Sequence, residues 1–118
     1  MAKTAVLTMS VQITGDGVNE TYNLMAATPF INQNAPGGGP VATSLALGDN
    51  PITVPPNSLM MFIQPLATST ITLKLKGIGG DTGFSLGPGQ VAMVPLVAGV
   101  TSVLVNASAA VVVSILFS

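Results

Sequence analysis

The sequence predicts an all-β protein, in the form of one antiparallel β-sandwich domain with a jelly-roll-like arrangement over residues 1–118. Three observations favour this fold. Apolar and polar residues alternate in several segments, which is the period of a strand with one buried face. Gly, Pro, Asn and Asp form turn signals roughly every ten residues. No segment combines a 3.6-residue apolar period with helix caps, so no helix is predicted.

The N-terminal segment predicts two strands joined by a turn. Apolar residues from Ala5 to Ile13 alternate with Thr, Ser and Gln, which indicates a strand with one buried face. The sequence Gly15-Asp16-Gly17 is a turn signal, because glycine tolerates positive φ and aspartate can bond its own backbone. A second strand is expected over residues 18–25.

Residues 26–40 contain three prolines and three consecutive glycines. Prolines and glycines this frequent interrupt helices and strands, so we expect the longest loop of the chain here. Because proline limits the entropy lost on ordering, the segment is also expected to be an extended arm that can reach a neighbouring molecule.

The middle of the chain resumes the alternation. Strands are expected at 41–47, at 52–54 and, fully buried, at 59–63, with a turn at 48–51. Residues 68–76 predict a further strand. Its residues Ile71, Leu73 and Leu75 are expected to point inward, while Thr70, Thr72, Lys74 and Lys76 point outward.

The last third predicts four more strands. A glycine-rich connection at 77–83 leads to a brief strand at 84–86, and a turn at 87–89 precedes strands at 90–96, 100–106 and 109–117. The apolar stretch 91–117 could also suggest a membrane anchor. Pro95, Gly99, Asn106 and Ser108 interrupt it, and flanking Lys, Arg, Trp or Tyr anchors are missing, so strands are preferred.

Charge is the most unusual property of the composition. Only seven of the 118 residues are charged, and the sequence has no His, Arg, Cys or Trp. Three lysines cannot neutralise a row of phosphates, so nucleic-acid binding is not expected. Serine or threonine nucleophiles would need a positioned base, and thiolate chemistry needs cysteine. The composition therefore predicts a protein that is not an enzyme.

Several residues are candidates for a functional site, and the structural interpretation is preferred for each. Asp16, Asp49 and Asp81 lie in glycine-flanked turns and are too isolated for a calcium loop. Residues 77–83 lack the Lys-Ser or Lys-Thr of a phosphate-binding loop. Glu20 is the only acid on a predicted strand, so paired carboxylates for glycoside cleavage are not expected. No catalytic, cofactor-binding or metal-binding residue is assigned.

The remaining polar and aromatic candidates also have structural interpretations. Lys74 and Lys76 predict a solvated sheet face. Four phenylalanines are expected in the core, while Tyr22 would have to be exposed to serve a carbohydrate groove. Asn19-Glu20-Thr21 and Asn106-Ala107-Ser108 match the glycosylation pattern, which has meaning only in a secreted protein. An uncharged, strand-rich surface predicts self-association. Charged residues on edge strands normally prevent pairing between molecules, and this chain has few lysines to do so.

Residues 71–86 read Ile-Thr-Leu-Lys-Leu-Lys-Gly-Ile-Gly-Gly-Asp-Thr-Gly-Phe-Ser-Leu, and residues 109–117 form an apolar run. With Gly-Asp-Thr-Gly leading into a short strand and a proline turn, the chain resembles small β-sandwich structural proteins of tailed-phage virions. That resemblance implies no catalytic residues and no cofactor.

The resemblance implies a capsid decoration or cement protein that stabilises a phage head by bridging capsid subunits. The expected partners are other copies of the chain, as a homotrimer, and the major capsid protein or other virion proteins, with neither nucleic acid nor membrane. The expected location is the virion, assembled in the host cytoplasm. The alternative is a neck, tail or fibre module that binds glycans.

Overall fold

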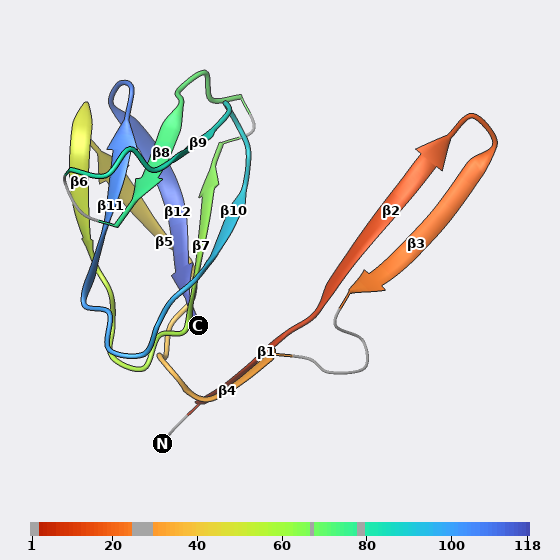
Figure 1. Ribbon diagram of the computed structural model, residues 1–118, viewed down its shortest axis with the longest axis horizontal. Coiled ribbons are helices and arrows are strands. Elements are labelled where there is room, and N and C mark those ends of the chain that lie inside the picture. The colour runs from red at the N-terminus through yellow and green to blue at the C-terminus, as the bar shows by residue number, and fades with distance from the viewer. Residues whose placement is uncertain (1–2, 25–29, 67, 78–79) are drawn as a thin grey trace.

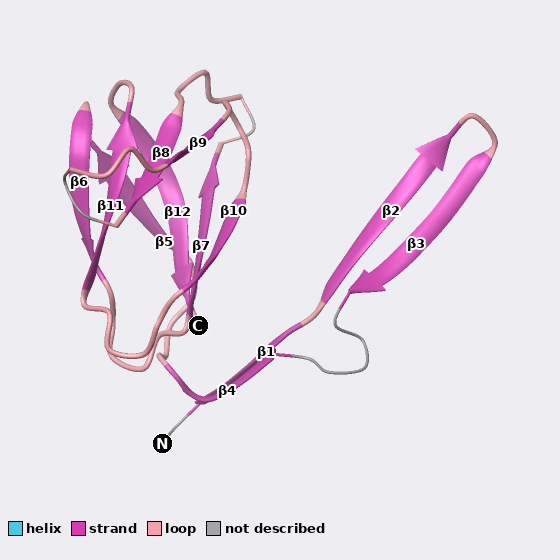
Figure 2. Cartoon of the chain, viewed as in Figure 1, coloured by secondary structure: helices cyan, strands magenta, loops and turns pink. Residues whose placement is uncertain are grey.

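The structure is a computed structural model that describes residues 3–24, 30–66, 68–77 and 80–118. Within these residues there are twelve β-strands and no helix. Figure 1 and Figure 2 show how the strands are arranged. Eight of the strands form two four-stranded antiparallel sheets that face each other. The prediction of an all-β antiparallel sandwich is therefore confirmed.

The first sheet has the strand order β10-β7-β12-β5 and the second has the order β6-β11-β8-β9. In the first sheet the strands are β5 (Val41–Leu45), β7 (Met60–Pro65), β10 (Ala92–Pro95) and β12 (Val111–Phe117). In the second they are β6 (Gly48–Thr53), β8 (Leu73–Lys76), β9 (Phe84–Leu86) and β11 (Ser102–Ala107).

The strand pairs of the sandwich are nested. The chain neighbours β8 and β9 pair with each other, and around them β7 pairs with β10, β6 with β11 and β5 with β12. The sandwich therefore has the connectivity of one long hairpin folded over on itself, in which successive strands alternate between the two sheets except for β8 and β9, which share one.

The core lies between the sheets and follows the period of two. Inward residues of adjacent strands meet there, and Ile63 and Val105 have no exposed surface. The buried cluster is made of Leu45, Ile52, Met61, Ile63, Leu73, Leu75, Leu86, Ala92, Val105, Ala107, Val113 and Ile115. Each fully buried aliphatic side chain contributes about 1.5–3 kcal/mol relative to an exposed one.

The other four strands form an arm that extends from the sandwich (Figure 1). Strand β1 (Lys3–Leu7) pairs with β4 (Phe30–Ala35) as the stem, and β2 (Met9–Gly15) pairs with β3 (Val18–Leu24) as the outer hairpin. The radius of gyration is 15.7 Å. A compact domain of this length would have about 13.5 Å. The difference reflects the arm.

A buried amide fastens the stem of the arm to the sandwich. Asn32 on β4 is buried, and its Nδ2 donates to the carbonyl oxygen of Asn57 at 2.8 Å. The Oδ1 of Asn32 accepts from the backbone N–H of Asn34 at 3.1 Å. Because both polar ends of the buried amide have partners, the stem has a fixed place beside the turn that follows β6.

Several local expectations for the N-terminal third need correction. Residues 5–13 do not form one strand with one buried face: they belong to β1 and β2, and most of β2 is exposed. Residues 26–40 do not lack regular structure throughout, because Phe30–Ala35 form β4 by pairing with β1. Residues 25–29 lie outside the described part of the chain.

The expected turn at 48–51 is also wrong, since these residues lie in β6. The chain turns earlier, because the side chain of Asn50 bonds both the N–H and the carbonyl of Ala46 at 2.9 Å. Pro51 fits a strand here because β6 is at the edge of its sheet.

The expected strands at 59–63 and 68–76 are correct only in part. Strand β7 is not fully buried, because Phe62 is half-buried and Gln64 is exposed on its outer face. Regular pairing in the second segment begins only at Leu73, although Leu73 and Leu75 do point into the core.

Candidate functional site

The outer face of the second sheet carries most of the charge of the sandwich. Asp49, Lys74, Lys76 and Asn106 point outward there. Nζ of Lys76 lies 3.1 Å from Oδ1 of Asp49, and Nδ2 of Asn106 donates to the same oxygen at 2.8 Å. The hydrogen bond from Asn106, followed by that from Lys76, holds the pKa of Asp49 below its usual value. Lys74 is exposed, as the spacing predicts, but the expectation of a solvated position is wrong for Lys76, whose side chain is only 11% exposed because it lies against Asp49.

The outer face of the first sheet is different, because none of its strand residues is charged. Register places Met93, Phe62 and Leu116 side by side across three strands, with Val112 further along β12. Gln64, Ser114 and Ser44 provide the only polar side chains of this face. We call it the neutral face. A sheet face that meets water normally carries charged residues, so this one has the composition of a contact surface.

The outer hairpin of the arm is amphipathic. Directly paired residues share a face, so Val11, Ile13, Val18 and Tyr22 lie together with Met9 and Glu20. Val11, Ile13 and Tyr22 are 46%, 49% and 49% exposed. We call this the apolar arm face. An isolated two-stranded hairpin is marginally stable at best in water, so the pattern indicates burial against something outside the arm.

The opposite face of the hairpin is wholly polar. It carries Ser10, Gln12, Thr14, Asn19, Thr21 and Asn23, and Nε2 of Gln12 donates to Oδ1 of Asn19 at 3.3 Å. On the apolar arm face, the hydroxyl of Tyr22 donates to the carboxylate of Glu20. That bond, followed by slight desolvation, raises the pKa of Tyr22. Glu20 and Tyr22 thus form one polar pair within an otherwise apolar surface.

A third apolar surface lies where β9 and β10 border the opening between the sheets. Phe84 is 56% exposed and Val97 is 77% exposed. Both line a cavity of about 470 Å³ together with Val94, Leu96 and Val100. We call these five residues the β9–β10 rim. The expected core position of Phe84 is wrong, because β9 is an edge strand. Phe62 and Phe117 are half-buried, and the side chain of Phe30 lies outside the described part.

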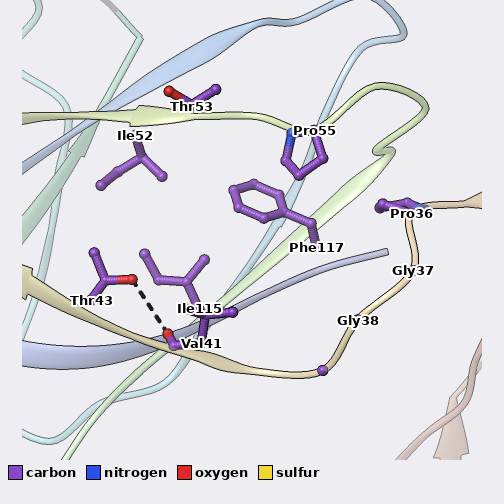
Figure 3. Close-up of a pocket in the computed structure, with 11 residues that line it drawn as sticks. Pro36, Gly37, Gly38, Val41, Thr43, Ile52, Thr53, Pro55, Ile115 and Phe117 are labelled. Carbon is purple, nitrogen blue, oxygen red and sulfur yellow. Dashed lines mark hydrogen bonds between the residues drawn. The ribbon is translucent and has the colours of Figure 1, made fainter.

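The opposite opening of the sandwich holds a smaller cavity of about 290 Å³. Figure 3 shows Ile52, Ile115 and Phe117 pointing into it from the two sheets, with Gly37 and Gly38 along one side. Thr43 uses its hydroxyl to bond the carbonyl of Val41 at 3.3 Å. No ionisable side chain lines this cavity. It can accept an apolar group but offers no acid, base or nucleophile pair.

The structure does not bring the three candidate aspartates together. Asp16 sits in the β2–β3 turn with φ of 47°, Asp49 is paired as described above, and Asp81 lies in the loop before β9. Among the described residues, no group of three or more His, Cys, Asp or Glu is close enough to hold a metal ion. Within 77–83, residues 78 and 79 lie outside the described part.

The two glycosylation patterns have structural partners. Asn19 bonds Gln12 on the arm, and Asn106 bonds Asp49. The Oγ of Ser108 accepts from the backbone N–H of Thr72 at 3.0 Å. The two asparagines therefore bond across strands, and Ser108 bonds a backbone group in the segment before β8.

Comparison with protein-family models, with curated proteins and with solved structures found no match to this chain. The described part of the chain contains no helix with the length and hydropathy required to cross a bilayer. The functional interpretation therefore depends on the surfaces: a neutral face, an apolar arm face and the β9–β10 rim.

Proposed function

We propose that this protein is a virion structural protein that decorates or cements a phage capsid. It assembles with copies of itself, as a trimer, and bridges neighbouring capsid subunits. The observation that carries this function is the presence of three separate apolar surfaces on a chain of 118 residues. Monomeric soluble proteins rarely expose large apolar patches, and a subunit of a lattice covers them by contact.

The sandwich is proposed to be a jelly roll, since its eight strands form nested pairs across two four-stranded sheets. The proposed partners are the major capsid protein or other virion proteins, and the proposed location is the virion. No catalytic role is proposed.

Stabilisation would follow from mass action. A protein that binds the assembled shell but not its separated subunits shifts the equilibrium toward the intact shell. Specific stable interfaces bury on the order of 1,600 Å² in total. The β9–β10 rim is the proposed lattice contact, because it lies away from the neutral face and exposes Val97 and Phe84.

The test is binding to capsids that lack the protein. Purified protein is added to such particles, and the bound fraction is measured by co-sedimentation. Val97→Asp should reduce the affinity at least 100-fold, because a carboxylate would be desolvated at the contact. Ser85→Asp places the same charge on the outer face of the second sheet and should change it less than threefold. Absence of binding by the unmodified protein contradicts the proposal.

A second candidate is a neck, tail or fibre module that binds glycans. The exposed ring of Tyr22 favours it, because aromatic side chains are the usual platforms for sugars. Titration of the protein with host surface glycans, followed by NMR, tests this function. It predicts shifts around Tyr22 that vanish in Tyr22→Ala, whereas the decoration function predicts no shifts.

A further inference from the structure

The apolar arm face is exposed, and the neutral face is covered only in part: Phe62, Met93 and Leu116 are half-buried, whereas Ser44, Gln64 and Val112 are exposed. We propose that the β2–β3 arm of one copy lies across the neutral face of a second copy. Each chain gives one arm and receives one. This arm exchange rests on the self-association in the proposed function. It specifies which two surfaces of the chain are in contact.

The apolar side of the β2–β3 hairpin is exposed in the single chain. Its apolar arm face presents Val11, Ile13 and Tyr22 to solvent, although the strict alternation of β2 is that of a half-buried strand. In Figure 1 the β2–β3 hairpin stands away from the sandwich of its own chain. The surface that buries it must therefore belong to another molecule.

The neutral face has a suitable shape for a two-stranded ribbon. It is four strands wide, which is about 19 Å, and a ribbon is about 10 Å wide. One end of the face is already met by the stem of the arm: Val6 and Leu7 of β1, with Phe62 and Leu116, line a notch of about 230 Å³. An arm arriving from another copy would continue this contact along β7 and β12.

The single carboxylate on the apolar arm face also has partners on the neutral face. Glu20 already accepts from Tyr22. Gln64 and Ser114 are directly paired across β7 and β12 and point outward, so an amide and a hydroxyl are offered to the remaining lone pairs. Since the neutral face carries no acid, burial of Glu20 there meets no like charge.

The area decides how the exchange must be arranged. A seven-residue ribbon presents a face of roughly 24 by 10 Å, or about 240 Å². A chain that both gives and receives an arm thus loses about 500 Å², and two such chains reach the ~1,000 Å² expected of a biological interface. One arm given without return falls short. A mutual exchange in a pair reaches this area with the arms alone, whereas in a ring, which includes the trimer, each interface holds one arm and the sandwiches must supply the remaining contact.

Because the sequence has no cysteine, single thiols report the contact directly. Val11→Cys marks the apolar arm face, Val112→Cys marks the neutral face and Thr21→Cys marks the polar side of the arm. Two single variants are refolded together, treated with a short bismaleimide and separated on a denaturing gel. Any linked product joins two different chains.

The expected result is a linked dimer from Val11→Cys mixed with Val112→Cys, at least tenfold more than from Thr21→Cys mixed with Val112→Cys. Linkage of Val11→Cys alone would mean that arms pack on arms, and equal linkage from both sides of the arm would mean random contact. Either result overturns the exchange.

A second measurement separates the exchange from the proposed function. Ser114→Asp should weaken self-association at least 100-fold in sedimentation velocity, and Ser85→Asp should leave it within threefold. If oligomers form but ignore both Ser114→Asp and the thiol pair, the exchange is wrong and another surface or partner covers the arm. Particle binding by the unmodified protein is measured separately, so its failure contradicts the capsid function alone.

Discussion

Gly83 should be among the least replaceable residues of the sandwich, and its substitution by alanine tests the packing of β8 against β9. Its φ is +70°, and a Cβ there would overlap the backbone carbonyl of Leu75 and lie 2.8 Å from Cγ of Lys76. The positive φ alone costs alanine about 1–2 kcal/mol. Relief of the overlap must move β9, whose Leu86 is buried and contributes about 1.5–3 kcal/mol.

Gly83→Ala should therefore lower the free energy of unfolding by about 2.5–5 kcal/mol. The matched control is Gly99→Ala, since Gly99 has φ of +91° with no atom within 4 Å of an added Cβ. The control should lose only about 1–2 kcal/mol. Urea unfolding measures both variants. Equal losses would refute the reasoning, because they would show that backbone conformation, and not close packing, requires Gly83.

Three further predictions concern the core, the stem and the ionic face. Ile63→Ala should lower the free energy of unfolding by about 2–5 kcal/mol, because the side chain is fully buried. Val112→Ala on the neutral face should lower it by less than about 1 kcal/mol in the monomer. Calorimetry on dilute protein compares the two variants. Asn32→Ala leaves the Asn57 carbonyl without its donor and should lower the free energy of unfolding by about 1–3 kcal/mol. Because this amide fastens the stem, backbone hydrogen exchange in β4 should also become faster. Because the pKa of Asp49 is lowered in the folded state, its ionisation stabilises the fold at pH values above the unfolded pKa of about 3.9, and this stability is lost as the pH falls through the folded pKa. In Asp49→Asn the free energy of unfolding should therefore depend less on pH in that range. An unchanged slope would contradict this prediction.

The fold class could be predicted because strand signals are local. Alternation located strands at β2 and β8, although it joined β2 to β1 and began β8 too early, and the glycine and proline turns separated β9 from β10. Gly15-Asp16-Gly17 forms the expected turn, with all three φ values positive. Each of these features depends on residues close together in the sequence, so it survives any tertiary arrangement.

The locations of the surfaces could not be predicted in the same way. The alternation of Val11 and Ile13 shows that one face of a strand is apolar, but it does not say whether the cover comes from the same chain or from another. The exposure of Phe84 depends on the place of β9 at a sheet edge. The turn made by Asn50 depends on a side chain that reaches back to Ala46. These outcomes follow from tertiary pairing.

The difference in charge between the two outer faces of the sandwich could be predicted from the sequence only in part. The spacing of Lys74 and Lys76 predicted a solvated face, and the structure adds Asp49 and Asn106 from neighbouring strands. The neutral face has no comparable signal in sequence order, because its residues come from β5, β7, β10 and β12. A lack of charge becomes informative only when register places those residues side by side.

Sedimentation velocity of the unmodified protein over a range of concentrations tests the central claim most directly, beside a variant in which a short glycine linker replaces residues 9–24. The unmodified chain should form a discrete oligomer that dissociates on dilution, and the variant should remain a folded monomer. An unmodified chain that sediments as an 11.8 kDa monomer at every concentration would contradict the account.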